Sequence, residues 1–276
     1  MEEQLNLIFF PASYSEFFSM WNRYPKAAPY AGGTALIREQ GSQVLELPPI
    51  ILSLEKIEEM QRISRSERYL EIGAMVKLSQ IIDLGKNVPV TLRRCLEGIA
   101  GMQLRNMATI GGSLCVQGGC LDASAVLAAL DAQCELRNSH SSRWISASRF
   151  FSTPGRTGLK PQELLTRIRV PMDTWDHSIY KKFAGQANQS KAVVFLVKAQ
   201  KNILSDLRIV YKSNAIWRDK DSESILIGKR LPLNRRIAAD FIESWSAYMS
   251  GILDADELSR KELVNFIELN ILDLSE

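Results

Sequence analysis

The stretch that decides the fold covers residues 26–36 and reads Lys-Ala-Ala-Pro-Tyr-Ala-Gly-Gly-Thr-Ala-Leu. Its first half, Lys26 to Tyr30, is short and apolar enough to form a β-strand. The strand would end at Gly32 and Gly33, which can adopt positive φ and carry no Cβ, so successive backbone N–H groups can converge on an anion. Thr34 adds a hydroxyl donor. The turn is therefore a candidate pyrophosphate site, with an ordinary tight turn as the alternative.

A second pair of glycines follows in the sequence Thr109-Ile110-Gly111-Gly112-Ser113, and we expect a second turn of the same kind there. Two such turns could hold opposite ends of one long ligand. The chain has no G-x-G-x-x-G sequence that opens a helix and no G-x-x-x-x-G-K-[ST] sequence. These absences argue against a Rossmann dinucleotide fold and against a P-loop.

The pattern around the first turn predicts a small parallel α/β unit. Ser13 and Glu16 have the spacing of a capping box, which predicts a helix from there to about Arg23. A second strand is expected near Val44 to Leu47. The connection that leads to it is too long for a hairpin, so the two strands should run parallel.

From about residue 60 the pattern changes to short strands and helices. Arg62 to Ser64 and Tyr69 to Ile72 are expected to form a β-hairpin. Further strands are expected at Cys134 to Arg137, Trp144 to Ser146 and Leu164 to Val170, and helices at Thr91 to Met102 and Asp122 to Leu130. The segment from Asp173 to Asp176 looks like a break between domains. Beyond it we expect a strand at Tyr180 to Phe183, a helix at Ala192 to Lys201, a strand at Leu207 to Tyr211 and two C-terminal helices.

Composition excludes several classes of protein. The 276 residues carry 34 basic and 31 acidic side chains, and the basic ones are scattered, which argues against nucleic-acid binding. The apolar run from Leu7 to Phe10 is too short for a signal peptide core. No stretch reaches the roughly 20 apolar residues that a membrane span needs. We therefore expect a cytoplasmic protein without a membrane span.

The cysteines and histidines do not suggest a metal site or a nucleophilic centre. Cys95, Cys115, Cys120 and Cys134 contain no C-x-x-C pair, so reduced thiols are expected and no metal ligand is assigned. The two histidines lie in polar, loop-like contexts. No serine, histidine and acid arrangement suggests a triad, and we name no catalytic side chain.

Taken together, several motifs resemble the FAD-binding subunits of the molybdenum hydroxylases. These motifs are the first diglycine with its neighbours (31–36), Ile72-Gly73-Ala74, the stretch from Arg105 to Leu114, Asp122, and Leu130-Asp131-Ala132. The family includes the flavin subunits or domains of xanthine dehydrogenase and carbon monoxide dehydrogenase. The similarity in order and spacing covers about residues 5–230.

The resemblance implies an α+β fold with two FAD-binding subdomains of the vanillyl-alcohol oxidase/PCMH type. A C-terminal α+β domain like that of the carbon monoxide dehydrogenase flavoprotein would follow. On this basis the FAD-binding domain covers residues 1–172, with subdomains at about 1–57 and 58–172, and the C-terminal domain covers 173–276. FAD is the implied cofactor.

The resemblance also implies which residues contact FAD. The set comprises Ala31, Gly32, Gly33, Thr34, Ala35 and Leu36 at the pyrophosphate, Ile99 and Ala100 near the adenine, Thr109, Gly111, Gly112 and Ser113 around the phosphates and flavin, Asp122 at the ribose hydroxyls, and Leu165 and Lys182 near the isoalloxazine ring. Without the resemblance, Asp122 would be an N-terminal helix cap, and Lys182 would be a solvated strand residue.

Three positions depart from the family pattern. The family commonly has an acidic residue where this chain has Ala35, and it often has Asn where this chain has Ser113. The stretch Gly185-Gln186-Ala187 lacks an arginine that the family frequently has there. These differences put NAD as electron acceptor in doubt and are compatible with weaker FAD binding.

The function implied is that of an FAD-binding electron-transfer subunit of a xanthine dehydrogenase-like molybdenum hydroxylase. Its partners would be a small 2Fe-2S subunit and a large molybdopterin subunit, with NAD or another molecule as acceptor. In such a subunit the cofactor performs the redox chemistry and the polypeptide positions it. Two alternatives stay open: a flavin-free scaffold subunit of the same type of complex, and a stand-alone flavin oxidase.

Overall fold

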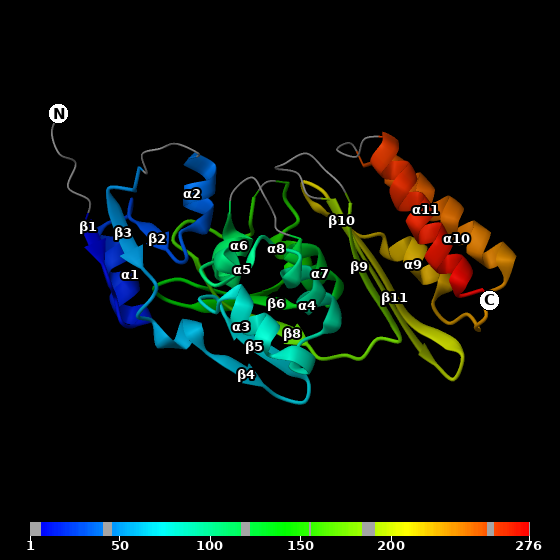
Figure 1. Cartoon of the computed structure of the whole chain (residues 1–276), viewed down its shortest axis with the longest axis horizontal. Helices are drawn as coiled ribbons and strands as arrows, with labels where there is room; N and C mark the ends of the chain where they lie inside the picture. Colours follow the sequence, from blue (N-terminus) through cyan, green and yellow to red (C-terminus); the bar gives the residue numbers. More distant parts are fainter. Residues whose placement is uncertain are drawn as a thin grey trace.

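Three β-sheets follow one another along the long axis of the molecule, and helices cover them (Figure 1). This computed structural model describes residues 7–40, 46–116, 122–154, 156–183, 191–252 and 257–275. Each sheet lies within one of the ranges 1–57, 58–172 and 173–276. The domain boundaries themselves stay a prediction. The mixture of helices and sheets agrees with the predicted α+β class.

The N-terminal unit is a three-stranded parallel sheet in the order β1-β3-β2. Its elements are β1 (Leu7–Phe9), α1 (Tyr14–Arg23), β2 (Ala28–Tyr30), α2 (Thr34–Gln40) and β3 (Ile50–Ser53). The predicted parallel unit is confirmed, and α1 begins as predicted, with the Ser13 hydroxyl accepting from the Glu16 amide at 3.2 Å. The Glu16 carboxylate accepts from the Ala12 amide instead of that of Ser13.

The prediction of a strand at Val44 to Leu47 is wrong for residues 46 and 47, which are the part that the structure describes. Residues 46–49 belong to no strand, and β3 begins at Ile50. Pro48 and Pro49 have no N–H to donate to a sheet, so a central strand can begin only after them. The two residues at 44–45 lie outside the described residues.

The second sheet has five antiparallel strands in the order β4-β5-β8-β6-β7. They are β4 (Ile63–Arg65), β5 (Tyr69–Gly73), β6 (Gln133–Arg137), β7 (Ser142–Ser146) and β8 (Leu164–Pro171), and the predicted β4–β5 hairpin is confirmed. Around them lie η1 (Glu58–Gln61), α3 (Leu78–Asp83), η2 (Gly85–Asn87), α4 (Val90–Glu97), α5 (Met102–Arg105), α6 (Ile110–Cys115), α7 (Ala123–Ala129) and α8 (Ala147–Phe150). Along β8, Ile168 and Val170 are buried while Arg167 and Arg169 are partly exposed, so the helices cover one face.

The helix predicted from Thr91 to Met102 is interrupted. It ends at Glu97 with Gly98 as its C-cap, and a separate short helix, α5, begins at Met102. Between them Ala100 adopts a φ of 50°, in the left-handed region that an α-helix cannot contain.

The third sheet has four antiparallel strands in the order β12-β11-β10-β9. Its strands are β9 (His177–Phe183), β10 (Lys191–Gln200), β11 (Ile203–Lys212) and β12 (Ile216–Trp217), and α9 (Lys220–Leu226), α10 (Arg235–Ser250) and α11 (Glu257–Asp273) follow. None of the helices in the described ranges is both long and apolar enough to cross a bilayer.

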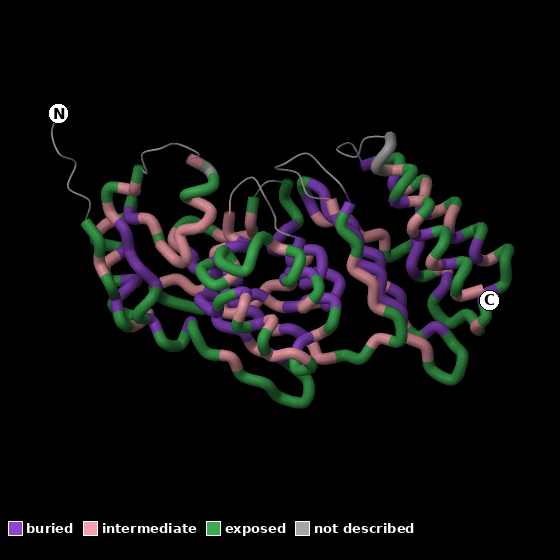
Figure 2. The backbone as a smooth tube through the Cα atoms, in the orientation of Figure 1, coloured by how far each residue is buried: buried purple, intermediate pink, exposed green. Residues whose placement is uncertain are grey.

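The helix predicted at Ala192 to Lys201 is wrong, because this segment forms β10. Its Val194 and Leu196 pack into the core of the second sheet and its helices, while Val193 and Phe195 pack into the core formed with α9 to α11. A strand buried on both faces has a continuous apolar sequence, which periodicity alone cannot distinguish from a buried helix. Figure 2 colours most of this strand as buried.

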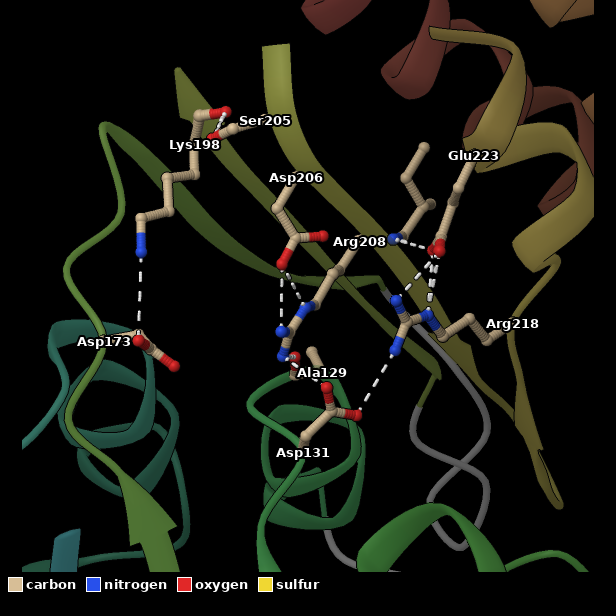
Figure 3. A network of polar contacts seen from close by, with 10 residues as sticks. Ala129, Asp131, Asp173, Lys198, Ser205, Asp206, Arg208, Arg218 and Glu223 are labelled. Carbon is tan, nitrogen blue, oxygen red and sulfur yellow. Dashed lines mark hydrogen bonds and ion pairs between the residues drawn. The ribbon is translucent and has the colours of Figure 1, made fainter. Parts of the chain in front are cut away.

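A network of charged side chains links the end of α7 to the third sheet (Figure 3). The Arg208 guanidinium lies 2.8 Å from the Asp131 carboxylate and 2.9 Å from that of Asp206, and it donates to the Ala129 carbonyl at 2.8 Å. Arg218 pairs with Asp131 at 3.4 Å and with Glu223 at 2.9 Å. Two arginines from different segments of the C-terminal part of the chain therefore pair with Asp131.

Replacing Arg208 by Ala should lower the free energy of unfolding by about 1–3 kcal/mol, because the arginine side chain is only 13% exposed and its loss leaves Asp206 and Asp131 without this partner. Urea denaturation measures the change. The control is Arg62→Ala, which removes a 3.8 Å pair with Glu58 whose side chains are 71% and 84% exposed. That variant should change stability by less than about 0.5 kcal/mol. Equal effects of the two substitutions would contradict the proposed importance of the network.

Candidate functional site

A cleft of about 660 Å³ lies where the first glycine turn meets the segment that leads into α6. Its walls come from β2 and α2 on one side and from the α4–α5–α6 region on the other. The lining residues are Ala28, Pro29, Tyr30, Ala31, Gly32, Gly33, Thr34, Ala35, Leu36, Ile37, Arg38, Pro48, Leu78, Ile99, Ala100, Leu104, Arg105, Met107, Ala108, Thr109, Gly112, Ser113, Cys115 and Val116.

The first turn has the backbone properties that the sequence predicts. Gly33 adopts a φ of +68°, which favours glycine, and a Cβ there would lie 2.1 Å from the hydroxyl at the end of the Tyr30 side chain, so a substitution would strain the turn and displace Tyr30. Within the described part of the chain, no protein acceptor receives the backbone N–H groups of residues 32–35. Four consecutive donors at the wall of a cleft can hold an anion.

The second glycine pair is not a turn of this kind, and that prediction is wrong. Gly111 and Gly112 lie in the first turn of α6, with Thr109 as its N-cap. The Gly111 amide donates to the Ala74 carbonyl at 2.8 Å, and the Gly112 amide donates to the Thr109 hydroxyl at 3.1 Å. The Ile110 amide likewise donates to the Val76 carbonyl at 2.9 Å. The protein itself therefore uses the donors that a second anion site would need.

Close packing explains the glycines of α6. A Cβ on Gly111 would lie 2.5 Å from the Ala74 Cβ, and one on Gly112 would lie 2.9 Å from the Thr109 hydroxyl oxygen. Gly112 also faces the first turn, since its Cβ position is 3.6 Å from the Ala31 Cβ. The two glycine motifs are thus neighbours, although they are far apart in the sequence.

Gly32 provides the closest approach between the two segments. A Cβ at this position would lie 2.1 Å from the Met107 carbonyl oxygen and 3.2 Å from the Ala108 Cα. Both of these atoms belong to the backbone, which cannot move aside as the end of a side chain can. The absence of a side chain at Gly32 therefore allows the first turn to pack against the segment before α6.

The cleft is cationic and largely apolar. Arg38 and Arg105 are the charged residues among its described lining residues, which include no carboxylate. The side chains of Ile37, Leu104 and Met107 are 55%, 47% and 50% exposed, although all three belong to the cleft wall. Exposed apolar side chains beside free backbone donors suit a ligand with a planar ring and an anionic linker.

Comparison with known proteins identifies the family. Residues 3–173 match the model of the FAD binding domain in molybdopterin dehydrogenase. The chain belongs to this family. FAD is therefore its cofactor, and it is a component of an oxidoreductase, as the sequence motifs predict.

Individual proteins also resemble this chain over most of its length. The chain is 31% identical over 209 residues to the glyceraldehyde dehydrogenase medium chain of Sulfolobus acidocaldarius, covering 74% of each protein. It is 26% identical over 271 residues to the nicotine 6-hydroxylase medium subunit of Paenarthrobacter nicotinovorans, covering 95% of each. The quinoline 2-oxidoreductase structure from Pseudomonas putida 86 has the same fold, with a TM-score of 0.78, 23% identity, and coverage of 98% of this chain and 96% of that one.

Most of the residues that the family resemblance implies lie in the cleft. Eleven of the fifteen line it, namely Ala31, Gly32, Gly33, Thr34, Ala35, Leu36, Ile99, Ala100, Thr109, Gly112 and Ser113. Gly111, Asp122, Leu165 and Lys182 do not. Gly111 packs against Ala74, and Leu165 is buried in β8. Contact of any of the fifteen with FAD stays a prediction.

Asp122 and Lys182 lie together, away from the cleft lining. The Lys182 ammonium is 2.9 Å from the Asp122 carboxylate, and that of Lys212 is 3.7 Å from it. The Tyr180 hydroxyl donates to the same carboxylate at 3.0 Å. Asp122 is the N-cap residue of α7, but its side chain makes no capping hydrogen bond. In this structure Asp122 therefore joins the start of α7 to β9 and β11. Neither the family resemblance nor the helix-cap pattern predicted these contacts.

Several lining residues escaped the sequence reasoning. Tyr30, Ile37, Arg38 and Leu104 line the cleft but belong to no nucleotide-binding signature. Their positions beside the glycine motifs were the one available signal. Arg105 and Met107 belong to the family motif from Arg105 to Leu114, but neither of them could be given a role from the sequence.

The thiols of Cys115 and Cys134 are unsuited to ligation or nucleophilic attack. Burial raises the pKa of each to about 12, so both remain protonated at neutral pH. Over the described ranges, no three or more His, Cys, Asp or Glu side chains are placed to bind a metal ion. Cys120 and the stretch Gly185-Gln186-Ala187 lie outside the described residues.

Replacing Gly32 by Ala should lower the free energy of unfolding by about 1–3 kcal/mol, since the new methyl group would overlap the Met107 carbonyl. Urea denaturation measures the loss. Gly98→Ala is the control, because Gly98 has a helical φ and the nearest atom to a Cβ there is 3.4 Å away. Wild-type stability in Gly32→Ala would mean that the two segments do not approach as closely as described.

Proposed function

We propose that this chain is the FAD-carrying electron-transfer subunit of a heteromeric molybdenum hydroxylase of the xanthine dehydrogenase type. One observation carries the proposal beyond family membership. The amides of residues 32–35, which have no acceptor in the described chain, stand beside an apolar wall, in a cleft whose described lining has two arginines and no carboxylate. This arrangement fits a dinucleotide with a diphosphate bridge.

In this proposal the N–H groups of residues 32–35 donate to the diphosphate. The Tyr30 hydroxyl, which lies under Gly33, and the cationic Arg38 are further groups available at the same end of the cleft. Ile99, Leu104 and Met107 provide an apolar surface against which a ring can pack. A ring bound there would exclude water from these side chains. Ala35 provides no acceptor, so any contact that an acidic residue would make there is absent.

Bound FAD would supply the redox chemistry, because its ring can accept and return electrons. The polypeptide would hold it and set the surrounding charge. Two of the relatives are named as a medium chain and a medium subunit. We infer from this that the chain assembles with a small 2Fe-2S subunit, which would deliver electrons, and with a large molybdopterin subunit. NAD or another molecule would be the acceptor, and a cytoplasmic location remains a prediction.

Titration of the purified chain with FAD should quench flavin fluorescence with saturation, and the bound cofactor should give the protein a yellow colour. Gly33→Ala should weaken FAD binding about tenfold or more, because its Cβ would displace the Tyr30 side chain from the cleft wall and alanine disfavours the positive φ of the turn. Gly85→Ala is the matched control. Gly85 has a similar φ of +58° but nothing within 4 Å of its Cβ position, and it lies outside the cleft.

A colourless protein that neither binds added FAD nor retains it in its complex would reject the proposal. If such a protein still assembled stably with its partner subunits, the flavin-free scaffold interpretation would replace it. Equal loss of FAD affinity in Gly33→Ala and Gly85→Ala would place the diphosphate elsewhere.

Co-expression with 2Fe-2S and molybdopterin subunits encoded beside its gene should yield one complex in size-exclusion chromatography. Its flavin should be bleached by the reducing substrate of the large subunit, since electrons would reach it through the iron-sulfur partner. A chain that elutes alone, and that oxidises a small alcohol with release of hydrogen peroxide, would favour the stand-alone oxidase instead.

A further inference from the structure

The loop between α4 and α5 forms one wall of the cleft in a strained conformation. Ile99 and Ala100 line the cleft, and Ala100 has a φ of 50°. An alanine in the left-handed region costs about 1–2 kcal/mol relative to ordinary backbone. The surrounding structure must therefore hold this loop in place.

Arg105 is the side chain that holds it. Its Nη1 donates to the carbonyl oxygens of Glu97 at 2.9 Å, Ile99 at 3.2 Å and Ala100 at 2.6 Å. The first of these carbonyls belongs to the last residue of α4, where carbonyl groups lack partners within the helix. Bonds from a guanidinium to neutral carbonyls are charge-assisted and stronger than ordinary ones. One cation thus ties together three carbonyls of the loop.

Arg105 is also placed to fix the loop relative to the rest of the cleft. It is the last residue of α5, and its own amide donates to the Gly101 carbonyl at 3.1 Å. Leu104 and Met107, on either side of it, contribute apolar side chains to the same wall. The Met107 carbonyl oxygen occupies the space that a Cβ on Gly32 would need. Arg105 and the three carbonyls that it binds form what we call the Arg105 clamp. Only Asn106 and Met107 lie between Arg105 and the point of contact with the turn at residues 32–35.

We infer that Arg105 is a positioning residue that pre-organises the 97–100 loop to receive the adenosine half of FAD. The inference rests on the proposed function. The amides of residues 32–35 suit the diphosphate, and the apolar wall of Ile99, Leu104 and Met107 suits a ring attached to it. A loop held in its bound conformation before the ligand arrives avoids the ordering cost that would otherwise weaken binding.

The test compares FAD with FMN, which lacks the adenosine half, in fluorescence titrations of Arg105→Ala, Arg105→Lys and wild type. Arg105→Ala should weaken FAD binding about tenfold or more and leave FMN binding within about twofold. Arg105→Lys should fall between, because an ammonium can donate to carbonyls but not in the planar geometry of a guanidinium. A purely structural role would lower the affinity for both flavins together.

Two further variants distinguish the effect of the Arg105 clamp from the effect of a nearby positive charge. Arg94→Ala removes an exposed cation from α4 that does not line the cleft, and it should leave FAD binding unchanged. Ala100→Gly removes the cost of the positive φ, so combining it with Arg105→Ala should restore part of the lost FAD affinity. Thermal unfolding of each variant shows whether it is folded, and Arg105→Lys carries the comparison if Arg105→Ala is not.

The outcomes distinguish the two proposals. Wild-type protein that does not bind FAD would remove the proposed function and this inference with it. Wild-type protein that binds FAD, together with Arg105→Ala that binds it equally well, would overturn the inference alone. Parallel losses of FAD and FMN affinity, or an equal effect of Arg94→Ala, would also overturn it.

Discussion

The backbone of Gly32 approaches the Met107 carbonyl so closely that no other residue could occupy the position, and the site depends on this approach. It brings the turn after β2, in the N-terminal unit, against the segment between α5 and α6, which lies among the helices around the second sheet. The cleft exists because these two segments meet there. Gly112, which faces Ala31, extends the same contact.

The two glycine motifs share this contact but have different electrostatic roles. The amides at the start of α6 are bonded to Val76, Ala74 and Thr109, so the protein satisfies them. Those of residues 32–35 have no acceptor in the described chain and remain available to a ligand. One motif therefore provides the scaffold, and the other provides the donors. In the described chain, the backbone donors that could bind an anion are therefore concentrated at the turn of residues 32–35.

The C-terminal sheet is joined to the flavin domain through both apolar and charged contacts. Val194 and Leu196 of β10 enter the core of the flavin domain, while Arg208 and Arg218 reach Asp131 at the end of α7. Asp122, at the start of the same helix, pairs with Lys182 and Lys212. Both ends of α7 are thus held by cations from the C-terminal sheet. The helix acts as the connection between the two parts of the chain.

The sequence by itself determined several local elements and the family. The Ser13 cap of α1, the β4–β5 hairpin and the strand just before Gly32-Gly33 were all predictable, because caps, turns and short apolar runs depend on neighbouring residues. Tertiary structure decided the rest. It made the apolar run of β10 a doubly buried strand, placed the second glycine pair inside a helix, and gave Asp122 its lysine partners. These outcomes depend on which distant segments pack together, and a local pattern of residues carries no information about that packing.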